Sequence, residues 1–267
     1  MKSKLKFIIL LSIGIFSFLF IQKIYSEPAK IKIAYQNTDN FPFQLGEGSD
    51  IDFKKPGLAV ELLVLVGERL NIEITFVRFP WKRGEKELKA GRIDGLFSAS
   101  FKTKRLELGV YPMKEGKVDP ARKNYSNSYA LYKLKGSSLS WDGKAFQHVS
   151  GPVGAPRGFS IVDDLKKHDI QVEETTSTLQ NLKKLVRGRL AGVATLDLLG
   201  DFFLREHKEM FKNIEKVEPL LVTKPYYLML SHQFVKKNQK LAEKIWDNIA
   251  LVRHLEEYKQ LSVKYFE

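Results

Sequence analysis

The sequence of 267 residues contains no cysteine. This absence excludes a disulfide framework, a thiolate metal site, a cysteine nucleophile and the lipidated cysteine that anchors a bacterial lipoprotein. Histidine is scarce, and its five residues show neither an HExxH motif nor a paired spacing. They are His148, His168, His207, His232 and His254. We therefore predict no metal site and interpret these histidines as surface or boundary residues.

Motifs for nucleotide binding and for hydrolysis are also missing. The sequence has no Walker phosphate loop and no GxGxxG fingerprint, and GFSIV around Ser160 lacks the final glycine of a GxSxG nucleophile elbow. Adjacent carboxylates occur at Asp163 and Asp164, but neighbours on a helix do not converge on one substrate. The sequence predicts no cofactor and no catalytic residue.

The N-terminus resembles an export signal. Three lysines within the first six residues precede the uncharged run FIILLSIGIFSFLFI, and the small residue Ser26 follows it. This layout is typical of a secretory signal peptide. The run is shorter than the roughly 20 residues that span a bilayer, so a permanent anchor is the less favoured alternative. We predict a signal peptide over residues 1–26 and a periplasmic protein.

The chain is basic, with 44 lysines and arginines, 31 acidic residues and a formal net charge of +13. Residues 1–26 hold four of the lysines and no acid, so the exported part stays basic. Such a charge steers anionic solutes toward a protein. Nucleic acid is not an expected partner outside the cytoplasm.

Apolar periodicity predicts two α/β units. Strand patterns around residues 30–36, 72–77 and 93–97 alternate with helical patterns over about 58–70 and 82–90. Residues 151–196 show the same order of predicted elements: strand, helix, strand, helix, strand. Such alternation predicts mainly parallel sheets that carry ligands at the carboxyl ends of their strands.

Two further strand patterns can cross between the units. YALYKL (129–134) leads from the first unit to the second, and PYYLMLS (225–231) leads back before two predicted helices over about 235–266. The sequence thus predicts an α/β fold of two lobes, with the second inserted into the first. The expected boundaries are residues 27–128 and 226–267 for lobe 1 and residues 129–225 for lobe 2.

Polar residues at strand ends form the candidate site. Ser98 and Ser100 lie at or just beyond the end of the strand IDGLF, and Arg105 follows within about one helical turn. Hydroxyl groups and a guanidinium can hold a carboxylate. Ser160 lies where a helix of the second unit begins, and free N–H groups at a helix start also suit an anion. These residues predict a clamp for a small anion between two lobes.

Simpler interpretations remain open for each residue. The three serines are also ordinary helix caps, and Arg105 is one cation among 44. Trp81 follows Pro80 at a helix start, which favours a place in the cleft, but its helical offset from Leu88 also suits the core.

The segment GLAVELLVLVGERLNIEITFVRFPWKRGEKELKAGRIDGLFSASFKTKR, with the export signal, the G-x-S turn and the returning strand, resembles the family 3 solute-binding proteins. These are periplasmic receptors typified by the amino-acid-binding components of ABC transporters. The resemblance implies a periplasmic-binding-protein-like fold of type 2, whose lobes close over a solute.

The resemblance also assigns roles to residues of this chain. Arg105 corresponds to the arginine that grips the ligand carboxylate, Ser98 and Ser100 to the preceding hydroxyls, and Ser160 to a hydroxyl of the second lobe. Asp197 corresponds, with a shift of one residue, to the acid that holds the ligand ammonium. Phe43 corresponds to an aromatic lid, although Asn40 replaces the usual tyrosine; Lys102 replaces a threonine, and Phe159 the first hydroxyl of the turn.

Three functions fit this resemblance. The first is a monomeric receptor that delivers a carboxylate-bearing solute, an amino acid or a related compound, to an ABC permease. The second is a sensor whose closed form binds a chemoreceptor or a sensor kinase. The third is an enzyme on the same fold with Glu61 or Asp197 as acid or base; no convergent acid and base set supports it, so we expect a binding protein rather than an enzyme.

Overall fold

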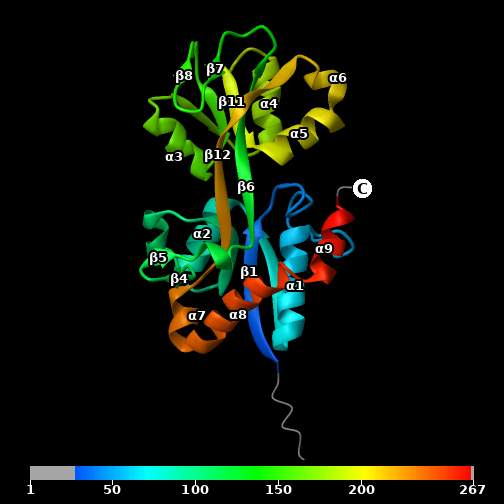
Figure 1. The fold of residues 1–267 in the computed structure, drawn as a ribbon, viewed down its shortest axis with the longest axis vertical. Helices are drawn as coiled ribbons and strands as arrows, with labels where there is room; N and C mark the ends of the chain where they lie inside the picture. Colours follow the sequence, from blue (N-terminus) through cyan, green and yellow to red (C-terminus); the bar gives the residue numbers. More distant parts are fainter. Residues whose placement is uncertain (1–27, 266–267) are drawn as a thin grey trace, which may run out of the picture.

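The computed structural model describes residues 28–265, and the predicted signal peptide therefore lies outside the described residues. The chain forms two lobes, one above the other in Figure 1, joined by two long strands. The principal strands form one eight-stranded sheet in the order β10-β9-β11-β6-β12-β3-β1-β2. The two-lobed α/β architecture, with the second lobe inserted into the first, agrees with the prediction from the sequence.

Lobe 1 is built around the parallel strand β1 (Ala29–Gln36), which pairs with β2 (Ile72–Phe79) on one side and β3 (Gly95–Ser100) on the other. Helices α1 (Leu58–Leu70) and α2 (Trp81–Lys89) connect these strands. All six residues of β3 are buried. Each element lies within three residues of its predicted bounds, because the apolar periodicity here is strong.

Gly57 fixes the start of α1 and the loop before it. Its φ of 109° lies in the region that favours glycine, and a Cβ at this position would lie 2.4 Å from Cα of Gln44. The N–H of Gly57 donates to the hydroxyl of Tyr265, 2.9 Å away, near the chain end. The loop that carries Asn40 and Gln44 is therefore held against both α1 and the C-terminal segment.

Two strands cross between the lobes. β6 (Tyr125–Leu134) and β12 (Ile214–Leu230) pair antiparallel, with a register shift between Val217 and Val222. The predicted return strand was therefore too short, because β12 already begins in lobe 2. The lobe boundaries predicted from the sequence, 128/129 and 225/226, fall inside these two strands.

Lobe 2 contains the predicted repeat of strands and helices. Two helices after β11, α5 and α6, were not predicted as such. The elements of this lobe are β7 (Ser140–Trp141), β8 (Phe146–Gln147), β9 (Val153–Pro156), α3 (Ser160–Lys167), β10 (Val172–Thr175), α4 (Thr178–Val186), β11 (Gly192–Leu196), α5 (Asp197–Glu206) and α6 (Lys208–Phe211).

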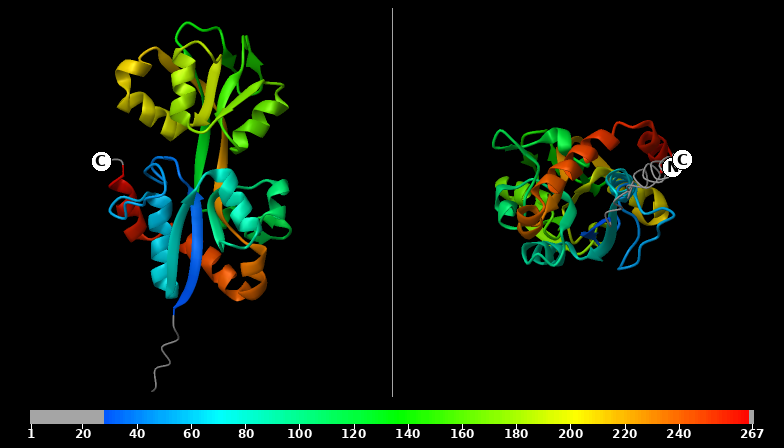
Figure 2. Two further views of the ribbon diagram at one scale, coloured as in Figure 1. Left: turned by 180° about the vertical axis from the view of Figure 1, so that it is seen from behind. Right: turned by 90° about the horizontal axis from the view of Figure 1, so that it is seen from below.

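Three helices, rather than the two predicted, follow β12 and return to lobe 1. They are α7 (His232–Lys237), α8 (Gln239–Val252) and α9 (Glu256–Val263). Figures 1 and 2 show α8 and α9 beside α1, and both helices contact α1. Trp246 of α8 is buried and donates its indole N–H to the carbonyl of Leu228 over 2.9 Å. The C-terminal helices thus anchor the end of β12 beneath the interlobe region.

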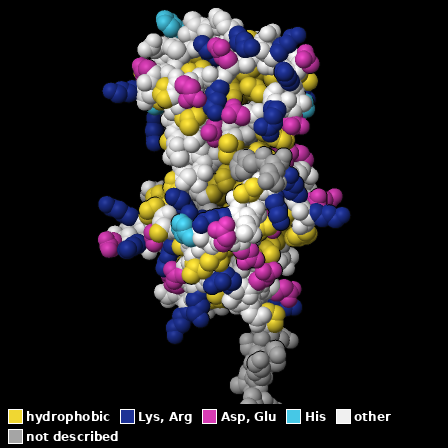
Figure 3. All heavy atoms as spheres, turned by 45° about the vertical axis from the view of Figure 1, so that its right-hand side comes forward, with side chains coloured by type: hydrophobic (Ala, Val, Ile, Leu, Met, Phe, Trp, Pro, Cys, Tyr) yellow, Lys and Arg dark blue, Asp and Glu magenta, His cyan; other side chains and the backbone are white. Residues whose placement is uncertain are grey.

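Short elements complete lobe 1. They are η1 (Thr103–Glu107), β4 (Met113–Lys114), β5 (Lys117–Val118) and η2 (Pro120–Arg122). Between residues 28 and 265, no helix is long and apolar enough to cross a membrane. Figure 3 shows basic and acidic side chains interspersed over both lobes on the face in view, so the positive net charge does not gather into one patch there.

Candidate ligand-binding cleft

A small pocket lies where the two lobes and the crossing strands meet, and its cavity volume is about 20 Å³. This volume holds about one water molecule, so the lobes must open to admit a solute. Its lining comes from both lobes and consists of Gln36, Asn40, Trp81, Ser98, Ser100, Arg105, Tyr129, Phe159, Ser160, Leu196 and Tyr226.

Arg105 provides the charge of this pocket. It lies in η1 and is only 4% exposed. Its Nη1 donates to the backbone oxygen of Ser100 at 2.9 Å and to the Ser100 hydroxyl at 3.0 Å. Its Nη2 donates across the cleft to the carbonyl of Gly158 at 3.3 Å. Arg105 thus joins lobe 1 to the turn that precedes α3.

A buried glutamate that the sequence analysis did not single out holds the rest of the guanidinium. Oε1 of Glu85 accepts the Nε–H of Arg105 at 3.2 Å and the indole N–H of Trp81 at 2.9 Å. Lys82 donates to the other oxygen at 2.8 Å. Trp81 and Glu85 are one helical turn apart on α2, so their side chains can meet, but no local pattern in the sequence pairs Glu85 with Arg105.

Trp81 serves both of the roles that the sequence left open. Its ring lines the pocket and faces the guanidinium of Arg105, whose carbon lies 5.0 Å from the ring centroid. The same side chain packs against Leu88 and Leu96 in a buried apolar cluster. The indole therefore forms a fixed wall under the cation rather than a mobile lid.

Ser98 and Ser100 lie inside β3 and not in a helix, so the helix-cap interpretation is wrong for both. Ser98 has a φ of 62°, and its hydroxyl donates to Oε1 of Gln44 at 3.1 Å. Ser100 binds Arg105, and its carbonyl also accepts from the hydroxyl of Tyr111 at 2.9 Å. Ser98 thus ties the strand to the Asn40–Gln44 loop, and Ser100 orients the arginine.

Ser160 is the first residue of α3, and Phe159 occupies the N-cap position without a side-chain cap bond. The hydroxyl of Ser160 donates to that of Tyr129 at 3.4 Å, and Tyr226 donates to the same oxygen at 3.0 Å. Burial raises the pKa of both tyrosines, which keeps them neutral. They lie on the crossing strands, so the floor of the cleft is made by residues that the sequence analysis had read only as strand.

Asp197 and Phe43 are not among the residues that line the pocket. Asp197 begins α5, and its Oδ1 accepts the backbone N–H of Leu198 at 2.8 Å. Its predecessor Leu196 lines the pocket instead. Phe43 is buried and stacks on Tyr125, with ring centroids 3.6 Å apart. It supports the pocket from behind and does not cover it.

Charged and aromatic contacts bridge the lobes beside the pocket. Lys102 and Lys104 of lobe 1 each lie 2.6 Å from Oδ2 of Asp163 on α3. Although burial opposes this effect, the two lysines hold the pKa of Asp163 well below its usual value. The ring of Phe41 stacks on that of Phe202 in α5 at a centroid distance of 5.1 Å. The lobes are therefore in a closed arrangement.

A family model for bacterial extracellular solute-binding proteins, family 3, matches residues 31–267. The chain belongs to this family. No curated protein matches the sequence. The family assignment agrees with the resemblance seen in the sequence and with the two-lobed fold.

Solved structures similar to this family 3 protein cover about nine-tenths of it. A histidine kinase sensor domain with similarity to periplasmic binding proteins has a TM-score of 0.71 at 17% identity, over 90% of this chain and 96% of the other. An ancestral arginine-binding protein bound to glutamine has a TM-score of 0.68 at 17% identity, over 90% of this chain and 99% of the other. A substrate-binding protein of an ABC uptake transporter from Streptococcus pneumoniae, with bound histidine, has a TM-score of 0.67 at 18% identity, over 89% of this chain and 92% of the other.

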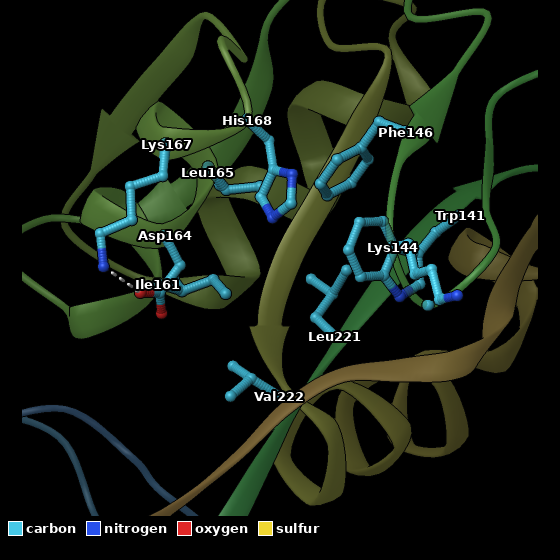
Figure 4. A pocket seen from close by; sticks show the side chains of 11 residues that line it. Trp141, Lys144, Phe146, Ile161, Asp164, Leu165, Lys167, His168, Leu221 and Val222 are labelled. Carbon is cyan, nitrogen blue, oxygen red and sulfur yellow. Dashed lines mark ion pairs between the residues drawn. The ribbon is translucent and has the colours of Figure 1, made fainter.

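A second, wider pocket of this solute-binding protein lies within lobe 2 (Figure 4). The rings of Trp141, Phe146 and His168 gather on one side of it, and Leu221 and Val222 of β12 form another wall. All of its lining residues belong to lobe 2, so closure of the lobes does not act on it. The cleft at Arg105 is therefore the candidate site. Residues 28–265 contain no cluster of histidines and acids that could hold a metal.

Proposed function

We propose that this protein closes its two lobes over a small polar, carboxylate-bearing solute and delivers it to an ABC permease. The observation that carries the proposal is Arg105, a buried cation that faces a pocket lined by Ser100, Ser160 and both crossing strands. A buried guanidinium requires an anionic or strongly polar partner on each free side, and a carboxylate is its best geometric match. Relatives of this fold with bound glutamine and histidine support a small polar solute.

The contacts of Arg105 suggest how the solute is held. Glu85 and Ser100 orient the guanidinium from one side and leave Nη2 directed at lobe 2, where it now donates to the Gly158 carbonyl. When the lobes open, this bond breaks and Nη2 becomes accessible. The carboxylate of the solute would take the place of the carbonyl and would also accept from the hydroxyl of Ser160.

Binding without chemistry fits the lining of the pocket. It includes no histidine, lysine or carboxylate, and burial keeps its tyrosines protonated. Glu61, the acid considered for an enzymatic role, lies on α1 and accepts from the hydroxyl of Tyr265 at 3.2 Å. No acid and base therefore face a common point in this cleft, as general acid–base catalysis would require.

The test is thermal unfolding of residues 27–267 against a library of amino acids, polar amines, organic acids and short peptides. A ligand at 100 times its Kd stabilises the folded protein by about 2.7 kcal/mol, which shifts the Tm visibly. The proposal predicts hits confined to carboxylate-bearing compounds. Hits that lack a carboxylate, or a folded protein without any hit, would contradict it.

A sensor function is the second candidate, because a histidine kinase sensor domain is among the similar structures. In this case the closed lobes would form the surface that a membrane receptor binds. Genes for a permease and an ATPase next to the coding gene support transport, and a gene for a sensor kinase supports sensing. Solute uptake by cells with and without the gene separates the two directly.

A further inference from the structure

The pocket at Arg105 has no acidic group in its lining. The residue that reaches it from the end of β11 is Leu196, which is buried, whereas the carboxylate of Asp197 caps the backbone of α5. The shift of one residue noted in the sequence therefore places an apolar side chain where an acid was expected. An ammonium group on the solute would meet no carboxylate here.

Three acids that neighbour lining residues of the pocket are engaged by cations of the protein. Glu85 binds Arg105 and Lys82. Asp163 binds Lys102 and Lys104.

Asp164, the next residue of α3, pairs with Lys224. Since each of these carboxylates already has a partner within its own cluster, none is available to compensate a further positive charge. Arg105 is the one charged residue in the lining of this pocket, and its charge is positive.

Two aromatic rings of the pocket already face cations of the protein. Rings of tryptophan and tyrosine can hold an ammonium through their negative faces. The guanidinium of Arg105 already lies over Trp81, 5.0 Å from its centroid, and Nζ of Lys224 lies 5.7 Å from the centroid of Tyr129. Two of the aromatic walls of this pocket are therefore occupied by cations of the protein itself.

Uncharged hydrogen-bonding groups line the side contributed by the loop after β1. Asn40 is 2% exposed, and its Nδ2 donates to the hydroxyl of Tyr125 at 3.3 Å. Its Oδ1 has no hydrogen-bond partner within the protein. A buried amide oxygen without a partner is unfavourable, and a neutral O–H or N–H of a solute would satisfy it.

We infer that the solute is a carboxylic acid without an ammonium group: its carboxylate faces Arg105, and an uncharged hydroxyl or amide faces Asn40. This inference rests on the proposed function, since it concerns the same pocket. The inference narrows the class of solute from amino acids and related acids to carboxylic acids whose remaining groups are uncharged, such as 2-hydroxy acids and amide-bearing acids.

The test compares matched solutes on the wild-type protein, residues 27–267, by isothermal titration. Leucine, phenylalanine and glutamine are each measured against the corresponding 2-hydroxy acid and the acid that lacks the amino group. We expect at least one neutral-ended acid to bind at least tenfold more tightly than its amino acid. An amino acid that binds tenfold more tightly than both analogues would overturn the inference and leave the proposed function intact.

A variant tests the role of Leu196 itself. Leu196→Asp supplies the missing acid, so this variant should bind the amino acid more tightly than the neutral-ended acid. Leu196→Asn introduces a neutral side chain of nearly the same size as Asp and should keep the wild-type preference. An unchanged preference in a folded Leu196→Asp variant would overturn the inference. If no acid of either set binds wild type, or if binding is unaffected in Arg105→Met, the proposed function fails and the inference fails with it. The wild-type comparison decides the matter even if Leu196→Asp does not fold.

Discussion

Oε1 of Glu85 accepts the Nε–H of Arg105 over 3.2 Å, and the two residues are only 6% and 4% exposed. The charge of the candidate binding arginine is therefore partly compensated before any solute arrives. This pair fixes the guanidinium plane against Trp81, and it leaves one edge of the guanidinium directed toward lobe 2. A solute then meets an oriented group that needs little rearrangement.

Removal of one partner from this pair should destabilise the protein. Glu85→Gln leaves Arg105 buried without its anion, and we expect the free energy of unfolding to fall by about 3 kcal/mol in urea denaturation. The double variant Glu85→Gln with Arg105→Met removes both charges and should recover most of this loss. The control is Glu87→Gln on the same helix, whose partners Arg83 and Arg92 are exposed, and it should leave the stability close to that of wild type. Additive effects of the two substitutions would contradict a coupled pair.

The closed arrangement should depend on Asp163. Because Asp163→Asn removes the anion shared by Lys102 and Lys104, we expect a larger radius of gyration in small-angle X-ray scattering. Asp169→Asn, at an exposed position just after α3, serves as the control and should scatter like wild type.

The same ion pairs predict a pH dependence. The pKa of Asp163 is lowered in the folded protein, so the ion pairs stabilise closure above the ordinary carboxyl pKa of about 4 and this stabilisation is lost as the pH falls further. The radius of gyration of wild type should stay constant from neutral pH down to about pH 4 and increase only below it. The Asp163→Asn variant should show the larger value throughout. If the Asp163→Asn variant had the wild-type radius of gyration at neutral pH, Asp163 would not hold the lobes closed.

Trp81 should report solute binding through its fluorescence. The chain has three tryptophans, and Trp81 is the one that lines the candidate cleft. Trp81→Phe should lose most of the fluorescence change produced by a bound solute, whereas Trp141→Phe should retain it. A signal that disappears in Trp141→Phe instead would indicate that the solute binds in the second pocket of lobe 2.

Phe43 should matter for stability more than for contact with the solute. The ring is buried against Tyr125, and truncation of a buried phenylalanine typically costs about 3–5 kcal/mol. We expect Phe43→Ala to lower the free energy of unfolding by this amount, measured by denaturation without solute. A variant as stable as wild type that has lost affinity would favour the lid role that the resemblance suggested.

Much of the fold could be predicted because its signals are local. The periodicity of residues 58–70 and the alternation of residues 72–77 depend on neighbours in the sequence, and these elements formed within two residues of the prediction. The full length of β12 could not be read, since its first half is only partly buried and its pairing with β6 is a long-range property.

The site was less predictable because it depends on contacts between distant segments. Arg105, Ser100 and Ser160 were singled out by residue type and position, and the structure brings them to one pocket. Glu85 could not be assigned to this cluster from the sequence, because its partner lies 20 residues away on another element. The choice between Leu196 and Asp197 depends on a single residue of register at the start of α5, which periodicity does not resolve.

The most direct measurement is the affinity of the solute found by thermal unfolding for wild type, Arg105→Met, and Arg105→Met in the Glu85→Gln background. If the carboxylate binds the buried guanidinium, both variants should lose about 2–5 kcal/mol of binding free energy, roughly thirty-fold to several thousand-fold in Kd. The double variant should lose this affinity while it recovers stability, which separates binding from folding. A Kd within threefold of the wild-type value in the folded double variant would contradict the central role of Arg105.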